Sequence, residues 1–146
     1  MRELDVLNIY RNQKAFSKAI EFVPYASFLG ITFEENSGEL VFRLPFSQHL
    51  IGNPLLPALH GGALAGFMEN AAMMHLLWET TPIDTPKNID FTIDFIRSGR
   101  PQDTFAVCSI TKLGSRVANL QIEAWQSDRT SPIAIARSHF LVRKLE

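Results

Sequence analysis

The sequence HGGALAGFMENAAMMHLLW, residues 60–78, is the longest apolar run of the chain. From Ala63 to Trp78, apolar residues cover nearly the whole circumference of a helix, which predicts a buried helix and not a surface one. We expect this helix to begin at Gly61 and to end near Thr80, because Pro82 cannot continue the hydrogen-bond ladder and also restricts the residue before it.

The start of this helix and the acid within it both point to chemistry. The adjacent glycines Gly61 and Gly62 let another molecule approach the backbone closely. The N–H groups of the first helical turn have no partner within the helix and lie at the positive end of its dipole. Glu69 follows two turns later, and a carboxylate is rarely buried without a partner or a task. Free amides and a buried carboxylate on one helix indicate acyl-transfer chemistry.

The residues before this helix predict a helix, a hairpin and a loop. Apolar residues recur at helical spacing over residues 4–20, which predicts an amphipathic helix that Pro24 closes. We expect the first strand over residues 28–35, and the turn residues Asn-Ser-Gly at 36–38 then predict a β-hairpin. Residues 46–59 contain two prolines and a glycine, so we expect an irregular loop there.

The residues after the helix predict antiparallel strands. In NIDFTIDFIR, residues 88–97, apolar residues alternate strictly with Asp90, Thr92 and Asp94, which is typical of a strand with one buried and one polar face. The apolar positions of this strand are Ile89, Phe91, Ile93 and Phe95. Three more strands are expected, bounded by turn residues: TFAVCSITKLG (104–114), SRVANLQIEAWQ (115–126) and PIAIARSHFLVR (132–143).

One long buried helix and about six strands in sequential hairpins indicate an α+β fold. An antiparallel sheet curved around the helix buries the apolar face of both, but it leaves one side of the helix open. A second copy of the chain would close that side, so we predict a homo-oligomer. We interpret residues 1–146 as a single domain in which residues 1–25 form a helical extension.

The composition argues against several classes of partner. The chain has 146 residues, of which 46% are hydrophobic and 20% charged, as in ordinary globular domains. A net charge of −1 without a basic run argues against nucleic acid, and polar residues within the longest apolar run argue against a membrane span. A single cysteine and a polar N-terminus fit a cytoplasmic location. The four histidines have no metal-ligand spacing, so we predict neither a metal nor a cofactor.

The segment HGGALAGFMEN resembles the hotdog-fold thioesterases, specifically the PaaI-type acyl-CoA thioesterases. In that family His-Gly-Gly begins the central helix and an acidic residue follows nine positions after the His, as Glu69 follows His60 here. The strand TIDFIRSG, residues 92–99, and the order of strands from Leu29 to Val142 are similar as well. The resemblance implies an antiparallel sheet wrapped around one long central helix, assembled as a dimer or a dimer of dimers, with active sites at the dimer interface.

The resemblance also implies roles for individual residues. Gly61 matches the glycine whose backbone amide polarises the thioester carbonyl, and Glu69 matches the general base or nucleophile. Many relatives carry an Asn six residues before the His; that position is Pro54 here, and Asn53 is one residue away. Some relatives carry a Ser or Thr one turn after the acid, where this chain has Met73. The catalytic candidates are therefore Glu69, Gly61, His60 and Asn53.

Further residues are candidates for binding the substrate. The second glycine of the pair can contribute to the oxyanion site, and arginines at strand ends can bind the phosphates of a CoA-type ligand. Asn88 precedes the alternating strand, where it is either a site amide or an ordinary turn residue. The substrate-binding candidates are Gly62, Asn88, Arg97 and Arg100.

These observations predict a cytoplasmic acyl-CoA thioesterase that releases a free acid and CoA, without nucleic acid or membrane as partner. Two alternatives stay open. A hydratase or dehydratase acting on acyl thioesters would use His49 together with Glu69. A non-catalytic acyl-CoA-binding module would bind the same ligand without turnover.

Overall fold

The computed structural model describes residues 2–80 and 84–143. Four α-helices are present in these ranges: α1 (Glu3–Asn12), α2 (Phe16–Glu21), α3 (Pro24–Leu29) and α4 (Gly61–Glu79). The six strands of the main sheet are β1 (Thr32–Asn36), β2 (Glu39–Leu44), β5 (Lys87–Phe95), β6 (Thr104–Leu113), β7 (Val117–Trp125) and β8 (Ala134–Leu141). A 3₁₀ helix, η1 (Gln48–Leu50), leads into a small hairpin of β3 (Ile51–Asn53) and β4 (Ala58–Leu59).

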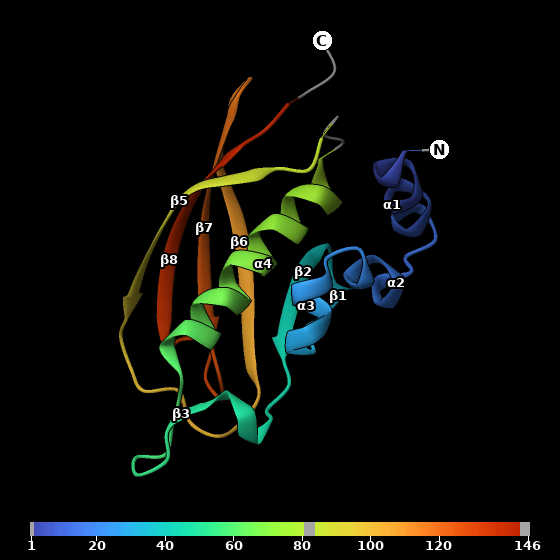
Figure 1. Cartoon of the computed structure of the whole chain (residues 1–146). Coiled ribbons are helices and arrows are strands. Elements are labelled where there is room, and N and C mark those ends of the chain that lie inside the picture. The colour runs from blue at the N-terminus through green and yellow to red at the C-terminus, as the bar shows by residue number, and fades with distance from the viewer. Residues whose placement is uncertain (1, 81–83, 144–146) are drawn as a thin grey trace.

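The main sheet is antiparallel and curves around α4, which confirms the predicted α+β fold with one long central helix (Figure 1). The strand order is β1-β2-β6-β7-β8-β5. The prediction of sequential hairpins is wrong for β5, which pairs with β8 and not with β6, its neighbour in sequence. Strand β2 takes the place beside β6, so β5 lies at an edge of the sheet.

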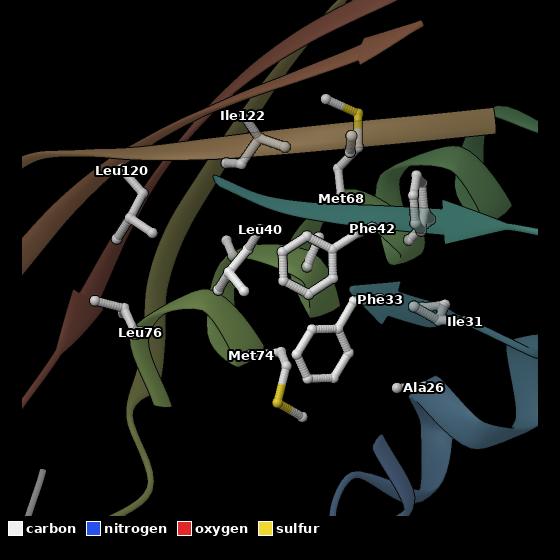
Figure 2. Packing of buried hydrophobic residues seen from close by; sticks show 14 of the residues in the cluster. Ala26, Ile31, Phe33, Leu40, Phe42, Met68, Met74, Leu76, Leu120 and Ile122 are labelled. Carbon is white, nitrogen blue, oxygen red and sulfur yellow. The ribbon is translucent and has the colours of Figure 1, made fainter. Parts of the chain in front are cut away.

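The core lies between α4 and the concave face of the sheet (Figure 2). The Phe33 and Phe42 rings stack with centroids 5.2 Å apart, and Met68 and Met74 of α4 are buried in the same cluster. Several positions that the strands present to α4 are alanines, whose small side chains let the helix approach the sheet closely. They are Ala106, Ala118, Ala124, Ala134 and Ala136.

The N-terminal helical region is present, but the prediction of one helix over residues 4–20 is wrong. Lys14 adopts a left-handed conformation with φ 52°, which separates α1 from α2. The break turns the chain so that α2 lies over the C-terminal end of α4, where Phe16 stacks on Trp78 with centroids 5.1 Å apart. Arg11 donates to the carbonyl oxygens of Trp78 and Thr80 and so satisfies groups that a helix end leaves free.

The first strand begins later than residue 28, where the sequence predicted it. Pro24 does not close the region but starts α3, because its fixed φ suits the first helical position. Gly30 ends α3 at φ 76°, and β1 starts only at Thr32. The hairpin prediction is confirmed: Ser37 and Gly38 both have positive φ between β1 and β2.

Strand β5 does not bury its whole apolar face, as its alternating sequence predicted. Phe91 and Ile93 are half-buried, whereas Ile89 and Phe95 are 55% and 54% exposed. The pairing with β8 shifts between Asn88 and Asp90, so the bulge at Ile89 interrupts the alternation. The edge position explains the remaining exposure, because nothing covers β5 beyond β8 in the part of the chain that the structure describes.

Helix α4 runs from Gly61 to Glu79, with Thr80 as its C-cap, and this confirms both predicted ends. The restriction that Pro82 was predicted to impose lies outside the described residues. The helix is not buried all round: Glu69 is half-buried in the single chain. The N-terminal helices cover part of the side that the sheet leaves open. Within the described residues, no helix is both long and apolar enough to cross a membrane.

Candidate active site

The site begins with the peptide N–H groups at the start of α4. His60 is the N-cap, and its Nδ1 accepts the N–H of Gly62 at 2.9 Å. The N–H groups of Ala63 and Leu64 both donate to the His60 carbonyl oxygen. The Gly61 N–H has no acceptor among the residues that the structure describes. Gly61 therefore presents a free amide at the positive end of the helix dipole.

Two glycines make the close contacts around this amide possible. A Cβ on Gly52 would lie 2.7 Å from the His60 Cα, a distance that side chains do not tolerate. Gly52 sits where the pairing of β3 with β4 shifts, so a bulge brings it against the helix start. A Cβ on Gly61 would lie 3.1 Å from the Phe95 ring, so Phe95 of β5 forms one wall beside the free amide.

Glu69 lies two turns along α4, and no hydrogen bond or ion pair joins it to another described residue. The helical rise separates the Cα atoms of Gly61 and Glu69 by about 12 Å along the axis. Groups that act on one carbonyl must each come within about 3 Å of the reacting atoms. The Gly61 amide and the Glu69 carboxylate of one chain thus lie at different positions along the helix and are placed to act on different carbonyl groups.

The structure places Asn53 near the helix start and Asn88 far from it. Asn53 lies on the hairpin that leads into His60, and its Oδ1 accepts the Leu55 N–H at 3.0 Å, which leaves its NH₂ group as the outward donor. Asn88 accepts a hydrogen bond from the Ser138 hydroxyl at 3.1 Å. It lies seven residues before Phe95, or about 23 Å along an extended strand, and so does not join Gly61.

Arg97 and Arg100 lie along a hollow that starts at Gly61. A cavity of about 370 Å³ beside Gly61 is walled by apolar side chains, including Leu59 and Phe95, and ends at Arg97. A second cavity of about 440 Å³ shares Arg97 with the first and contains Arg100. The two cavities share Arg97 and Ser98, so the apolar cavity beside Gly61 and the more polar cavity at Arg100 are neighbours.

The charged groups of the more polar cavity are held differently. Arg97 donates to the Pro132 carbonyl oxygen at 2.6 Å. The Thr130 hydroxyl and its backbone N–H hold the pKa of the nearby Asp128 carboxyl below its usual value, so this group stays ionised. The Arg100 guanidinium has no hydrogen-bond partner among the described residues, so all of its N–H groups are available to a ligand.

Comparison with known proteins fits this arrangement. The family model of the thioesterase superfamily matches residues 56–133, which include the helix start, Glu69 and both arginines. A crystal structure of a protein from Chromobacterium violaceum is 46% identical, with 97% of this chain and 99% of that chain covered and a TM-score of 0.81. The chain belongs to the thioesterase superfamily. No curated protein matches it.

More distant solved structures share the fold. A protein from Bacillus halodurans, crystallised with CoA, is 21% identical over 84% of this chain and 80% of its own, with a TM-score of 0.73. A phenylacetic acid degradation-related protein from Ralstonia eutropha is 17% identical over 82% of this chain and 90% of its own, also with a TM-score of 0.73. These likenesses confirm the hotdog fold that the HGG segment predicted.

No hydrogen bond joins His49 to Glu69 among the described residues. His49 shares a hydrogen bond of 2.7 Å with the Ser47 hydroxyl, and its ring lies 6.4 Å from that of Phe28. His75 has a buried Nδ1 without a hydrogen-bond partner in the described ranges. No group of three or more His, Cys, Asp or Glu side chains is arranged for a metal among the described residues.

Two residues of the site escaped the sequence analysis. Phe95 was assigned only to a buried face, although it lies against Gly61. The sequence predicts Gln126 as the last residue of a strand. In the structure its side chain is buried and hydrogen-bonded to the backbone of Arg100. The one feature of the sequence that points to Gln126 is its position as a polar residue directly after Ala124 and Trp125, which are both buried.

Proposed function

We propose that this chain is an acyl-CoA thioesterase of the PaaI type, which hydrolyses an acyl or aryl thioester to the free acid and CoA. The observation that carries the proposal is the free N–H of Gly61 at the start of α4, in a helix that also holds the unpaired carboxylate of Glu69. The helix start supplies a hydrogen-bond donor for the carbonyl oxygen, and its dipole favours the negative charge that develops there.

In the proposed reaction the Gly61 N–H donates to the thioester carbonyl oxygen. Glu69 takes a proton from water as the water oxygen bonds to the carbonyl carbon. The carbon–sulfur bond then breaks, the thiolate recovers the proton, and the free acid and the CoA thiol leave. Direct attack of Glu69 on the carbonyl, followed by hydrolysis of the anhydride, gives the same products.

The separation along α4 supports a site shared between two subunits. Because about 12 Å of helix lies between Gly61 and Glu69, we propose that the Gly61 amide of one subunit acts with the Glu69 carboxylate of another. His60 then acts mainly as the helix cap, which leaves the amide next to it free. Asn53 donates from its NH₂ group near the same carbonyl, and Gly62 shapes the helix start through its bond to His60.

The remaining parts of the substrate fit the two cavities beside the site. The apolar cavity next to Gly61 takes the pantetheine arm, and Arg97 and Arg100 bind phosphates in the more polar cavity. The Bacillus halodurans neighbour was crystallised with CoA, which supports this ligand class. Leu50 of the 46–59 loop is buried in the core, whereas Leu55 and Leu56 are exposed apolar side chains. We propose that these two favour a medium-chain or aromatic acyl group. The proposed location is the cytoplasm.

Release of free thiol from a panel of acyl-CoA thioesters tests the proposal. Glu69→Gln should keep the fold and the binding of a non-hydrolysable CoA analogue, while turnover falls by about 10²–10⁴, the usual contribution of a positioned acid or base. Glu79→Gln, on the exposed end of the same helix, is the matched control and should keep full activity. Unimpaired cleavage by a stable Glu69→Gln protein would contradict the mechanism.

Two outcomes would identify the alternatives. A change in the absorbance of an unsaturated acyl-CoA without thiol release, abolished by His49→Ala, would identify a hydratase. Tight binding of acyl-CoA without either reaction would identify a binding module.

A further inference from the structure

The side chain of Gln126 forms a paired contact with the backbone of Arg100. Its Oε1 accepts the Arg100 N–H at 2.9 Å, and its Nε2 donates to the Arg100 carbonyl oxygen at 2.9 Å. Nε2 also lies 3.2 Å from the Thr104 hydroxyl. Gln126 is only 8% exposed, so this amide is a buried connection and not a surface contact.

This contact holds a segment that has no strand partner. Residues 96–103 connect β5 to β6, and the two strands lie apart in the sheet. The Gln126 amide gives Arg100 both the donor and the acceptor that a neighbouring strand would give. On the other side of the segment, the Leu59 N–H donates to the Gly99 carbonyl oxygen at 2.9 Å. The segment is thus fixed both to β4, next to the Gly61 amide, and to the end of β7.

The cavity above Gln126 has an excess of positive charge. It contains Arg97 and Arg100 against one carboxylate, Asp128. Arg97 donates to a backbone carbonyl and lies close enough to Asp128 to affect its pKa, whereas the Arg100 guanidinium is unpaired among the described side chains. An anionic group that enters this cavity therefore finds in Arg100 a cation whose N–H groups are all available.

We infer that Gln126 is a positioning residue that fixes Arg100 for the phosphate end of a CoA thioester. The inference rests on the proposed function and deepens it, because it assigns the recognition of the phosphates to one buried amide outside the reacting centre. Without the Gln126 amide, the backbone of Arg100 loses two hydrogen bonds. The backbone position from which the Arg100 side chain extends is then no longer fixed. Part of the affinity for CoA then depends on Gln126 through its hold on the Arg100 backbone.

A purely structural role for Gln126 predicts a different outcome. If the role is purely structural, replacing Gln126 lowers stability and weakens the binding of every ligand of the site alike. If Gln126 positions Arg100, replacing it weakens the binding only of ligands that carry phosphates. CoA and pantetheine separate the two roles, because pantetheine has the same thiol arm but lacks the adenosine phosphates.

The experiment measures the dissociation constants of CoA and of pantetheine by calorimetry on the full chain. Gln126→Met keeps a similar side-chain length without the amide, and Gln121→Met on the exposed face of β7 is the matched control. We expect Gln126→Met to bind CoA about tenfold more weakly, the effect of one lost charge-assisted contact, with pantetheine affinity unchanged. The control should bind both ligands normally.

Arg100→Met provides the second arm, and it leaves the buried amide in place. It should lower the affinity for CoA as Gln126→Met does. The double variant should lose no more CoA affinity than Arg100→Met alone, because the two residues act through one contact. If Gln126→Met does not fold, Gln126→Leu also removes the amide without adding a charge, and the same cycle applies.

Three results would overturn the inference: equal weakening of CoA and pantetheine, additive losses in the double variant, or native CoA affinity in a folded Gln126→Met protein. Native protein that binds no CoA would overturn it as well. CoA binding that depends on Gln126 without any thioester cleavage would support it and would contradict the proposed hydrolysis.

Discussion

His60 shows how one side chain determines which peptide group of a helix start is free. Its Nδ1 accepts the Gly62 N–H, so its proton is placed on Nε2, and the Gly61 N–H stays without an acceptor among the described residues. A Ser or Asp cap would also accept from the second or third residue of the helix. The capping geometry therefore explains why the N–H before Gly62, and not that of Gly62 itself, is left without an acceptor among the described residues.

His60→Ala should lower the free energy of unfolding by about 1 kcal/mol, because the helix loses its cap. His60→Asn should restore most of that stability, since Asn is among the best capping residues. If His60 acts only as a cap, thioester cleavage should recover in His60→Asn as well. Urea unfolding and thiol release on both variants check this; a stable but inactive His60→Asn protein would show that the imidazole itself takes part.

His75 should make the protein sensitive to acid. Burial lowers its pKa from 6.5 to about 4, and its Nδ1 has no partner among the described residues. The unfolded chain therefore binds a proton at a higher pH than the folded chain does. Stability should fall as the pH drops from about 6.5 to about 4, by up to about 3 kcal/mol. Urea unfolding of the native protein and of His75→Met across this range should show that the free energy of unfolding depends less steeply on pH in the variant. Equal pH dependence in the two proteins would contradict the role given to His75.

At the scale of elements, long regular patterns were predictable and interruptions were not. The apolar run of α4 and the strands β5 to β8 follow directly from periodicity. The break at Lys14 and the bulge at Ile89 do not, because each puts a residue into a conformation that its type does not signal. Pro24 has the same ambiguity: it ends one helix or starts the next, and only the contacts of α3 decide.

The end of α1 offers a test of this kind of interruption. Lys14 is in the left-handed region, the Ala15 N–H donates to the Tyr10 carbonyl oxygen, and the Lys14 N–H donates to that of Arg11, which is the helix-end arrangement that glycine favours. Lys14→Gly should therefore raise the free energy of unfolding by about 0.5–1 kcal/mol. Lys18→Gly within α2 should lower it by a similar amount. Thermal unfolding of both variants checks the pair, and destabilisation by Lys14→Gly would contradict it.

At the scale of the whole molecule, the candidate site depends on contacts that sequence spacing does not encode. The placement of Gly61 and Glu69 on one helix was predictable, because that helix has a recognisable start. The separation of Asn88 from Gly61 and the position of Gln126 under Arg100 depend on which strands become neighbours in the sheet. Residues that are brought together by strand order are found only when the fold is known.

The exposed edge of the sheet supports the prediction of a homo-oligomer. Strand β5 has a free edge, and Ile89 and Phe95 on it are more than half exposed, a combination that single soluble chains avoid. We expect light scattering to give at least twice the 16.5 kDa of one chain at micromolar concentration. Ile89→Asp places a charge on this edge and should shift the protein toward the monomer.

The matched control is Ile9→Asp, at an apolar position that is 41% exposed in α1 and not part of this edge. It should leave the oligomer intact. Because the proposed site needs Glu69 from one subunit and Gly61 from another, thioester cleavage should fall together with the dimer fraction in Ile89→Asp. A native protein that scatters as a monomer would contradict the oligomer, and a monomeric Ile89→Asp protein with full activity would contradict the shared site.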